Sequence, residues 1–283
     1  MGPRLNAAGR LDSAKIALDL LVTKEVSDAG YLAQKLDSLN TKRQQITRQI
    51  QAKVEETIIE SDPDALLLFA INPEFNQGVV GLAASRLTEK YYRPAIIGFK
   101  GETYTHASCR SIKEFHITNA LEQCSDLLVY YGGHAAAAGF TVNNKNINEL
   151  SDRLKLIAEE QLSNQDIRPT IVADVEIPLA EIDPRTTEYL AWLQPTGYGN
   201  PDAVFVSRNL RVRNSRTVGK ENSHLKLTVS DDWITYDAIA FRQGYWVDQL
   251  PKYVDLAYNL EINEYQGKKR IQLNVKDIKP SGT

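Results

Sequence analysis

The sequence predicts an α/β plus all-β fold in three consecutive parts. Residues 1–62 carry one long stripe of apolar side chains at helical spacing, which predicts a connector helix. Residues 63–165 alternate strand-like and helix-like segments, which is typical of an α/β domain. Residues 166–283 contain short strands of alternating polarity separated by turn residues, which predicts a small closed barrel. For 283 residues, two domains are the default expectation, and the connector helix is additional.

The first part is predicted to be helical, with an amphipathic segment at residues 13–22 and a much longer helix after it. Ser27 suits the N-cap of the long helix, and Pro63 ends it because the residue before a proline disfavours the helical conformation. Its apolar residues recur at spacings of three, four or seven: Leu32, Leu36, Leu39, Ile46, Ile50, Val54 and Ile58. They form one stripe on a helix of about 30 residues.

The second part is predicted to form a sheet with covering helices. The expected strands are residues 65–71, 95–99 and 139–142, and the expected helices are 78–91, 115–125 and 147–162. A polar linker at 164–169 leads to the third part. The expected strands of this third part are 210–218, 225–229, 234–241, 254–264 and 270–278, and it has one short expected helix at 186–193.

Composition narrows the function classes. No apolar run is long enough to cross a bilayer and no secretory signal is seen, so we expect no membrane contact and a cytoplasmic location. With 33 Lys and Arg against 36 Asp and Glu, the net charge of −3 argues against a broad basic surface for nucleic acid. Cys109 and Cys124 are the only cysteines, which is typical of a reducing compartment. The four histidines have no partner at zinc-site spacing, so we expect no metal site in this chain.

Two glycine-containing strings have the residue types of anion-binding loops. Residues 2–10 place Arg4, Asn6 and Arg10 among glycines, which predicts a tight loop that holds an anion. The alternative is a plain loop leading into a helix, and the spacing alone favours that alternative by roughly two to one. The string from Asn76 to Gly81 precedes a predicted helix, and it either exposes N–H groups to a phosphate or packs the helix against a strand.

Two further strings carry phosphate-binding residue types. Ser108 and Arg110 combine a hydroxyl with a guanidinium fork that suits phosphate, unless the arginine is simply solvated. Gly132, Gly133 and His134, followed by four alanines, predict a tight loop that allows close backbone approach. His134 either donates a hydrogen bond to a phosphate or transfers a proton, or it is structural, and the odds are about even.

In this order and spacing, the four strings resemble the C-terminal part of the RecJ family, the single-stranded-DNA-specific exonucleases among the DHH phosphoesterases. The resemblance covers essentially the whole chain. It implies that residues 2–10 close the catalytic domain, that the long helix is the interdomain connector, and that 63–165 form the DHH-associated domain. The string from Pro195 to Pro201 resembles the start of the family's OB-fold domain, here residues 166–283.

The resemblance implies 5′→3′ hydrolysis of single-stranded DNA with Mn²⁺ or Mg²⁺, in DNA repair and recombination. The family's metal ligands are Asp and His residues in upstream motifs, and no Asp-His-His string exists here. We therefore expect the chain to begin at the end of the catalytic domain, to bind no metal by itself and to be inactive alone. Its expected partners are single-stranded DNA and a separate or missing DHH catalytic domain.

The resemblance also assigns residues to roles. Arg4, Asn6 and Arg10 would border the active site, and His134 is the one possible catalytic residue. The substrate phosphates would be bound by Ser108, Arg110 and His134, with backbone access at Gly132 and Gly133. Two positions depart from the family pattern: Cys109 replaces a glycine and is expected to narrow the groove, and Asn76 replaces a histidine that contacts phosphate.

The barrel contains cations and aromatics that suit a DNA strand. The cations lie in a stretch without acids: Arg208, Arg211, Arg213, Arg216 and Lys220. The aromatics that could stack on bases are Tyr198, Trp233, Tyr236, Phe241 and Trp246. The alternatives are that at least half of the aromatics fill the barrel core and that the arginines form a solvated face.

Two other functions fit parts of the pattern. The chain could be a non-catalytic single-stranded-DNA-binding or scaffold module that complements a separate catalytic domain. It could also be a phosphodiesterase for short oligonucleotides or cyclic dinucleotides. Such relatives share the Gly-Gly-His string but generally lack the long barrel, which makes this second alternative a poor fit.

Overall fold

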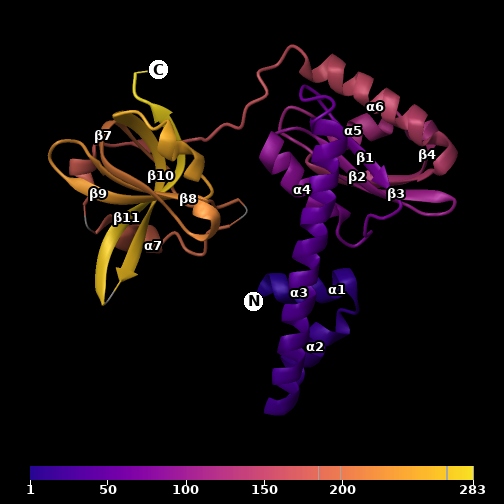
Figure 1. Ribbon diagram of the computed structural model, residues 1–283, viewed down its shortest axis with the longest axis horizontal. Helices are drawn as coiled ribbons and strands as arrows, with labels where there is room; N and C mark the ends of the chain where they lie inside the picture. The colour runs from indigo at the N-terminus through magenta and orange to yellow at the C-terminus, as the bar shows by residue number, and fades with distance from the viewer. Residues whose placement is uncertain (184, 198, 266, 283) are drawn as a thin grey trace. The chain divides into compact units, whose positions relative to one another are not determined.

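The structure is a computed structural model that describes residues 1–183, 185–197, 199–265 and 267–282. The chain divides into two compact units, Met1–Pro169 and Thr170–Thr283 (Figure 1). The predicted fold class, α/β plus all-β with a connector helix, is confirmed. Among the described residues, no helix is long and apolar enough to cross a membrane.

The first unit begins with three helices, α1 (Gly2–Leu11), α2 (Lys15–Val22) and α3 (Val26–Val54). The predicted long helix is confirmed, since α3 has 29 residues and continues into one π-helical turn, η1 (Glu55–Ile59). Ala8, Ile16 and Leu36 form a small buried cluster that holds α1 and α2 against α3. This packing explains why so polar a helix as α3 is stable, because tertiary contacts rather than propensity stabilise most helices.

The prediction of a tight loop at residues 2–10 is wrong, because this segment is helix α1. Pro3 lies in the first turn, where a missing N–H costs no helical hydrogen bond. Ala7 and Ala8 are fully buried. A helix buries these alanines on one face while it leaves the arginines exposed on the other.

The sheet of the first unit has five strands in the order β1-β2-β3-β5-β4. The strands are β1 (Leu68–Asn72), β2 (Ala95–Lys100), β3 (Tyr104–Arg110), β4 (Leu128–Gly133) and β5 (Ala137–Asn143). The helices that accompany them are α4 (Val80–Tyr91), α5 (Ile117–Glu122) and α6 (Ile147–Leu162). β1 and β2 are parallel and joined through α4, whereas the other pairings are antiparallel.

Two cores cover the two faces of this sheet. On one face, Leu68 and Ile97 pack with residues of α3 and α4, such as Val54. On the other face, Ile96 and Phe140 pack with residues of α5 and α6. On its own face, α4 packs against β2 and β3, so the side chains of β4 and β5 on that face lie outside the described cores.

Strand β4 has no counterpart among the predicted strands. It carries the exposed side chains of Val129 and Tyr130 and ends in two glycines, so it lacks the apolar alternation of a half-buried strand. Gly132 and Gly133, which we predicted to lie in a loop, are its last residues. Pairing with β5 on the sheet edge, rather than local sequence, makes this segment a strand.

The second unit is a barrel closed by pairing of its first and fourth long strands. Its elements are β6 (Val175–Glu176), α7 (Thr186–Ala191), β7 (Phe205–Val218), β8 (His224–Ser230), β9 (Thr235–Ala240), η6 (Gly244–Asp248), β10 (Tyr253–Tyr265) and β11 (Lys268–Pro280). The order β10-β11-β9-β8-β7, with β10 pairing back to β7, closes the barrel. β11 runs parallel to β9 and the other long-strand pairs are antiparallel, which is the connectivity of a five-stranded OB-fold.

Alternating inward side chains fill this barrel. Leu225, Leu227 and Val229 of β8 are buried, while Lys226 and Thr228 between them point outward. The hairpin of β10 and β11 is longer than the part of β11 that pairs with β9, which is residues 272–274. Tyr253–Tyr258 of β10 pair with β7, whereas Ile262 and Asn263 pair only with Ile271 and Arg270 of β11, and these four residues line a surface groove.

Candidate nucleic-acid interface

The strand register of the first unit aligns the predicted phosphate-binding residues on one sheet face. Ser108 of β3 lies opposite Gly139 of β5, and Gly139 lies opposite Gly132 of β4. Two residues further along β3, Arg110 lies opposite Ala137 of β5. Because side chains two residues apart share a face, a hydroxyl and a guanidinium border a strip that has almost no side chains. We call this strip and its border, Ser108, Arg110, Gly132, Ala137 and Gly139, the open face.

The beginning of α4 adjoins the open face. A Cβ atom added to Gly81 would lie 3.3 Å from Ser108 Oγ and 3.4 Å from Arg110 Nη2. The guanidinium of Arg110 is oriented by a 2.7 Å hydrogen bond that Nη1 donates to the Cys109 carbonyl. The first turn of α4 and the end of β3 therefore form one continuous surface.

The end of α1 contacts the segment that precedes α4. Arg10 Nη1 donates a 3.3 Å hydrogen bond to the Gly78 carbonyl, and a Cβ atom at Gly78 would lie 3.0 Å from the Arg10 carbonyl carbon and closer still to its oxygen. Asn76 Oδ1 accepts a 3.0 Å hydrogen bond from the Gly78 N–H, so the amide shapes this turn. Three strings that are distant in sequence, at 2–10, 76–81 and 108–111, thus meet.

The turn between β4 and β5 is fixed by hydrogen bonds from the start of α5 and from Ser111, which follows β3. The carbonyls of His134, Ala135 and Ala136 accept hydrogen bonds from Thr118 Oγ1 at 2.8 Å, Ile117 N at 3.1 Å and Ser111 N at 2.9 Å. In the described part of the chain, the N–H groups of Ala135 and Ala136 have no acceptor. Consecutive N–H groups of this kind can bind an anion.

Glycine is required at the start of this turn. Gly133 has a φ of +150°, and a Cβ atom there would lie 2.7 Å from the Ala138 side chain and closer still to the Ala137 carbonyl oxygen. The next residue, His134, donates its backbone N–H to the Ala137 carbonyl at 2.8 Å, and its side chain is exposed. The exposed imidazole is therefore held beside the turn by its backbone alone.

The expectation that Cys109 narrows the groove is wrong. Its side chain is fully buried on the opposite sheet face, with Ala138 and Phe140. Burial raises the pKa of the Cys109 thiol far above its ordinary value, and the nearby Arg110 offsets this only in part. Because alternate residues of a strand face opposite sides, a side chain at this position leaves the open face unchanged.

The other residues predicted on α1 lie apart from this junction. Arg4 Nε donates a 2.6 Å hydrogen bond to Asp37 of α3, so its charge is paired. Asn6 is exposed on the same helix. Of the three, Arg10 is the residue that contacts the segment before α4.

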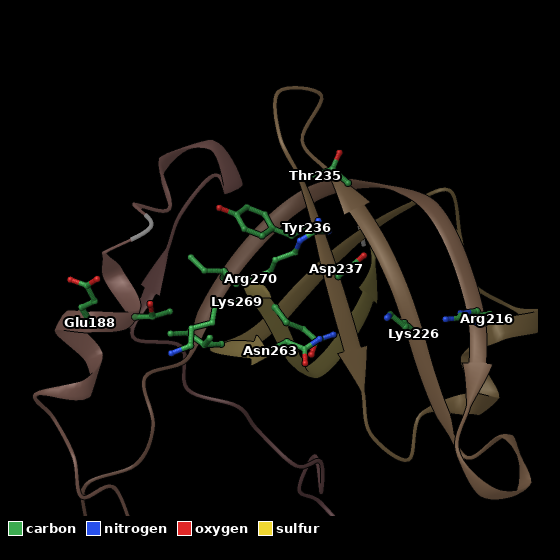
Figure 2. Close-up of a pocket in the computed structure, with 13 residues that line it drawn as sticks. Glu188, Arg216, Lys226, Thr235, Tyr236, Asp237, Asn263, Lys269 and Arg270 are labelled. Atoms are coloured by element: carbon green, nitrogen blue, oxygen red, sulfur yellow. The ribbon is translucent and has the colours of Figure 1, made fainter. Parts of the chain in front are cut away.

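A groove of about 1190 Å³ runs over the outer face of the barrel. Figure 2 shows Arg216 and Lys226 on neighbouring strands at one end, Asp237 in the middle, and Lys269 and Arg270 towards the other end. Glu188 of α7, Tyr236 of β9 and the arms of the β10–β11 hairpin complete the lining. Burial, with a contribution from Asp231, raises the pKa of Tyr236. The lining has four cations against two carboxylates, and one of these cations, Lys269, lies 3.9 Å from Glu264 outside the lining. The groove is therefore locally basic.

The five cations predicted on the barrel occupy different environments. Arg216 lines the groove. Arg208 pairs with Glu176 at 2.8 Å and with Asp255 at 3.4 Å. The remaining three are Arg213, 3.5 Å from Asp232, Lys220, 3.9 Å from Glu221, and the half-buried Arg211.

The predicted aromatics divide between core and surface. Tyr236 and Trp246 pack against the barrel core, whereas Trp233 and Phe241 are exposed. Tyr198 lies outside the described residues. The sequence reasoning omitted Lys226, Lys269 and Arg270 from the groove, although the outward position of Lys226 between buried leucines was a signal.

Comparison with known families decides what this chain is related to. The DHHA1 domain matches residues 64–160, and the RecJ OB domain matches residues 173–277. The chain belongs to the RecJ family. The resemblance carried by the four strings is therefore confirmed, and the OB-fold connectivity of the second unit agrees with it.

Individual RecJ proteins match the whole of this chain but only part of themselves. The single-stranded-DNA-specific exonuclease RecJ of Salmonella typhimurium is 34% identical, with 99% of this chain and 50% of the relative covered. RecJ of Bacillus subtilis is 30% identical, with 98% of this chain and 36% of the relative covered. The chain spans about half of the length of these relatives or less, and it corresponds to the C-terminal part of RecJ.

Solved RecJ structures agree with this assignment. The crystal structure of RecJ from Thermus thermophilus in complex with Mg²⁺ has a TM-score of 0.83 and 29% identity. The match covers 99% of this chain and 43% of that chain. A crystal structure of the same protein in complex with Mn²⁺ also gives a TM-score of 0.83. In the described part of our chain, no three His, Cys, Asp or Glu side chains are grouped so as to hold a metal ion.

Proposed function

We propose that this chain is the substrate-binding part of a 5′→3′ single-stranded-DNA exonuclease, acting in DNA repair and recombination. The observation that carries the proposal is the open face. Ser108, Arg110 and the free N–H groups of Ala135 and Ala136 adjoin a strip that lacks side chains, where a phosphodiester backbone can approach closely. The names of the RecJ relatives supply the substrate class.

Each group on the open face suits a phosphate oxygen. The Arg110 guanidinium presents a planar fork of N–H donors. The hydrogen bond that it donates to the Cys109 carbonyl orients the guanidinium before substrate binds. The Ser108 hydroxyl, on the same face, can donate a second hydrogen bond to a phosphate oxygen. A charge-assisted hydrogen bond of this kind contributes about 1.5–3 kcal/mol where it is shielded from water.

The barrel groove would hold a further stretch of the strand. Arg216, Lys226, Lys269 and Arg270 can contact phosphates. Tyr236 is only partly buried against the core, and the part of it that lines the groove offers a surface for base stacking. OB-folds bind oligonucleotides on the face of their second and third strands, which correspond to β8 and β9 here. A local groove of this kind reconciles DNA binding with the net charge of −3.

The metal that a RecJ-type reaction needs, Mn²⁺ or Mg²⁺, does not fit the residues described here, because no ligand cluster exists among them. We assign no chemical step to this chain, and we propose that a separate or missing DHH catalytic domain supplies the metal site. The same observation favours a second candidate, a non-catalytic single-stranded-DNA-binding or scaffold module that complements such a domain. A cytoplasmic location fits the free, buried cysteines Cys109 and Cys124.

Binding of the 283-residue chain to single- and double-stranded DNA of equal length tests the proposal. We expect a preference for the single strand and an affinity that falls steeply with salt, because bound phosphates release counterions. Equal affinity for the two forms would count against strand-specific binding. Addition of a metal-containing DHH catalytic domain distinguishes the candidates: restored 5′→3′ digestion supports the exonuclease part, and binding without digestion supports the module.

A further inference from the structure

The edge strand β4 contains a β-bulge that decides which of its side chains face the open face. The register of β4 against β5 shifts by one residue at Val129, so that Tyr130 lies opposite Thr141. Without this shift Tyr130 would lie opposite Phe140, which is buried in the core on the other face of the sheet. A shift of one residue moves a side chain to the other face, and bulges next to functional sites often redirect a side chain in this way. The bulge therefore places Tyr130 on the same face as Gly132.

The ring of Tyr130 lies along the edge of the glycine strip. A Cβ atom added to Gly132 would lie 3.5 Å from Tyr130 Oη and 4.0 Å from Tyr130 Cζ. Residues two apart on a strand are separated by about 6.6 Å, so the phenol leans along β4 towards Gly132. The Tyr130 side chain is nevertheless exposed, at 70%, and its hydroxyl makes no hydrogen bond among the described residues. The ring is therefore open to a flat group that enters the strip.

The neighbours of Tyr130 across the sheet continue this border. Thr141 lies opposite both Tyr130 of β4 and His106 of β3, and its Oγ1 lies 3.0 Å from His106 Nδ1. Ser108 and Arg110 follow His106 on the same face of β3, because alternate residues of a strand share a face. The open face therefore has a cationic end at Arg110 and an aromatic end at Tyr130, with the glycines between them.

We propose that Tyr130 is a base-stacking residue, which stacks on the base of the nucleotide whose phosphate Ser108 and Arg110 bind. This deepens the proposed function and rests on it. A nucleotide carries both chemistries that the open face offers, an anion for its cationic end and a flat aromatic group for its other end. Stacking requires a base whose face is not already covered by its neighbours in a duplex. Tyr130 therefore contributes to a preference for single strands, which phosphate contacts alone do not give.

Removal of the ring tests this role with two oligonucleotides of equal length, one with bases and one made of abasic deoxyribose phosphates. We expect Tyr130→Leu to weaken binding of the base-containing strand about tenfold and to leave the affinity for the abasic strand within about twofold. Tyr130→Phe keeps the ring and should stay within about twofold of the wild type on both strands. Because Tyr130→Leu removes no charge, the slope of log affinity against log salt should not change.

Tyr31→Leu on α3 is the matched control. Tyr31 has a similar exposure, 66%, and its side chain makes no hydrogen bond or ring contact among the described residues. We expect Tyr31→Leu to change the affinity for either strand less than about twofold. Both tyrosines are exposed, so both leucine variants should fold, and far-ultraviolet circular dichroism checks that they do.

The outcomes separate this inference from the proposed function. If the wild-type chain binds neither strand, the proposed function fails and the stacking role fails with it. If the wild type binds, but Tyr130→Leu behaves like Tyr31→Leu, only the stacking role is refuted. An equal loss of affinity for the base-containing and abasic strands in folded Tyr130→Leu protein would refute a contact with bases. An equal loss in Tyr130→Leu and Tyr130→Phe would assign the contact to the hydroxyl and would refute stacking on the ring.

Discussion

Replacement of Gly78 by alanine tests whether the end of α1 and the segment before α4 form one unit. The new Cβ would lie 3.0 Å from the carbonyl carbon and 3.3 Å from the Cα of Arg10, and closer still to the carbonyl oxygen. All three atoms belong to the backbone, so α1 must shift rather than a side chain rotate. Overpacking of this kind costs about 1–3 kcal/mol.

The matched control is Gly30→Ala on α3. Nothing lies within 4 Å of a Cβ atom at Gly30, and alanine in a helix is more stable than glycine by about 0.5–1 kcal/mol. We therefore expect opposite signs for the two substitutions: Gly78→Ala lowers the free energy of unfolding and Gly30→Ala raises it. The shift of α1 should also move Arg10 and weaken single-stranded-DNA binding.

The distribution of tryptophans makes the assay specific. Trp192, Trp233 and Trp246 all lie in the second unit, whereas most of the helix lies in the first. In urea, far-ultraviolet circular dichroism will therefore follow the first unit and tryptophan fluorescence the second. Gly78→Ala should shift only the circular-dichroism transition. Equal effects of the two glycine substitutions would refute the close packing of α1 on residue 78.

Three other substitutions probe the barrel and the sheet. Tyr258→Phe removes a 2.7 Å hydrogen bond to Ser207 and should cost about 1 kcal/mol in the fluorescence transition. Burial raises the pKa of Tyr258 to about 12, so the neutral phenol stabilises the fold below about pH 10. In the wild type this stabilisation should be lost between about pH 10 and 12, whereas the Tyr258→Phe protein should show no such loss. Lys226→Ala should weaken DNA binding and lower the slope of log affinity against log salt by about one. Arg208→Ala should change the affinity less than about twofold, because two carboxylates already pair with Arg208. Equal losses of affinity in the two variants would contradict DNA binding in the groove. Cys109→Ser should destabilise the first unit by about 1–3 kcal/mol yet leave the DNA affinity of the folded protein unchanged, and a loss of affinity would contradict the placement of this side chain in the core.

Elements with a strong local period could be predicted from the sequence. The apolar stripe of α3 and the alternation around Leu225 and Leu227 each specify one buried face, so helix and strand followed directly. Strand β4 could not be predicted, because its exposed Val129 and its glycines carry no period and only pairing with β5 orders it. The prediction of a loop at residues 2–10 was wrong because it relied on the glycines of this segment. The two alanines that the helix buries, Ala7 and Ala8, carry too short a pattern to indicate a helix.

The candidate site was predictable in its residue types but not in its geometry. The four strings identified Ser108 and Arg110, but their alignment with Gly132 depends on strand register, which local sequence does not specify. The opposite orientation of Cys109 follows from the same register. Among the barrel cations, partners distant in sequence decide which charges are paired, as Glu176 and Asp255 do for Arg208.

The central claim is that the open face binds the phosphates of single-stranded DNA, and Arg110→Ala tests it most directly. Lys113→Ala is the control, since Lys113 is an exposed cation close in sequence that forms no described ion pair. Equilibrium binding to one single-stranded oligonucleotide should weaken by about tenfold or more for Arg110→Ala, the equivalent of about 1.5–3 kcal/mol. Lys113→Ala should stay within about twofold of the wild type. Unchanged affinity of a folded Arg110→Ala protein, or an equal loss in both variants, would contradict the claim.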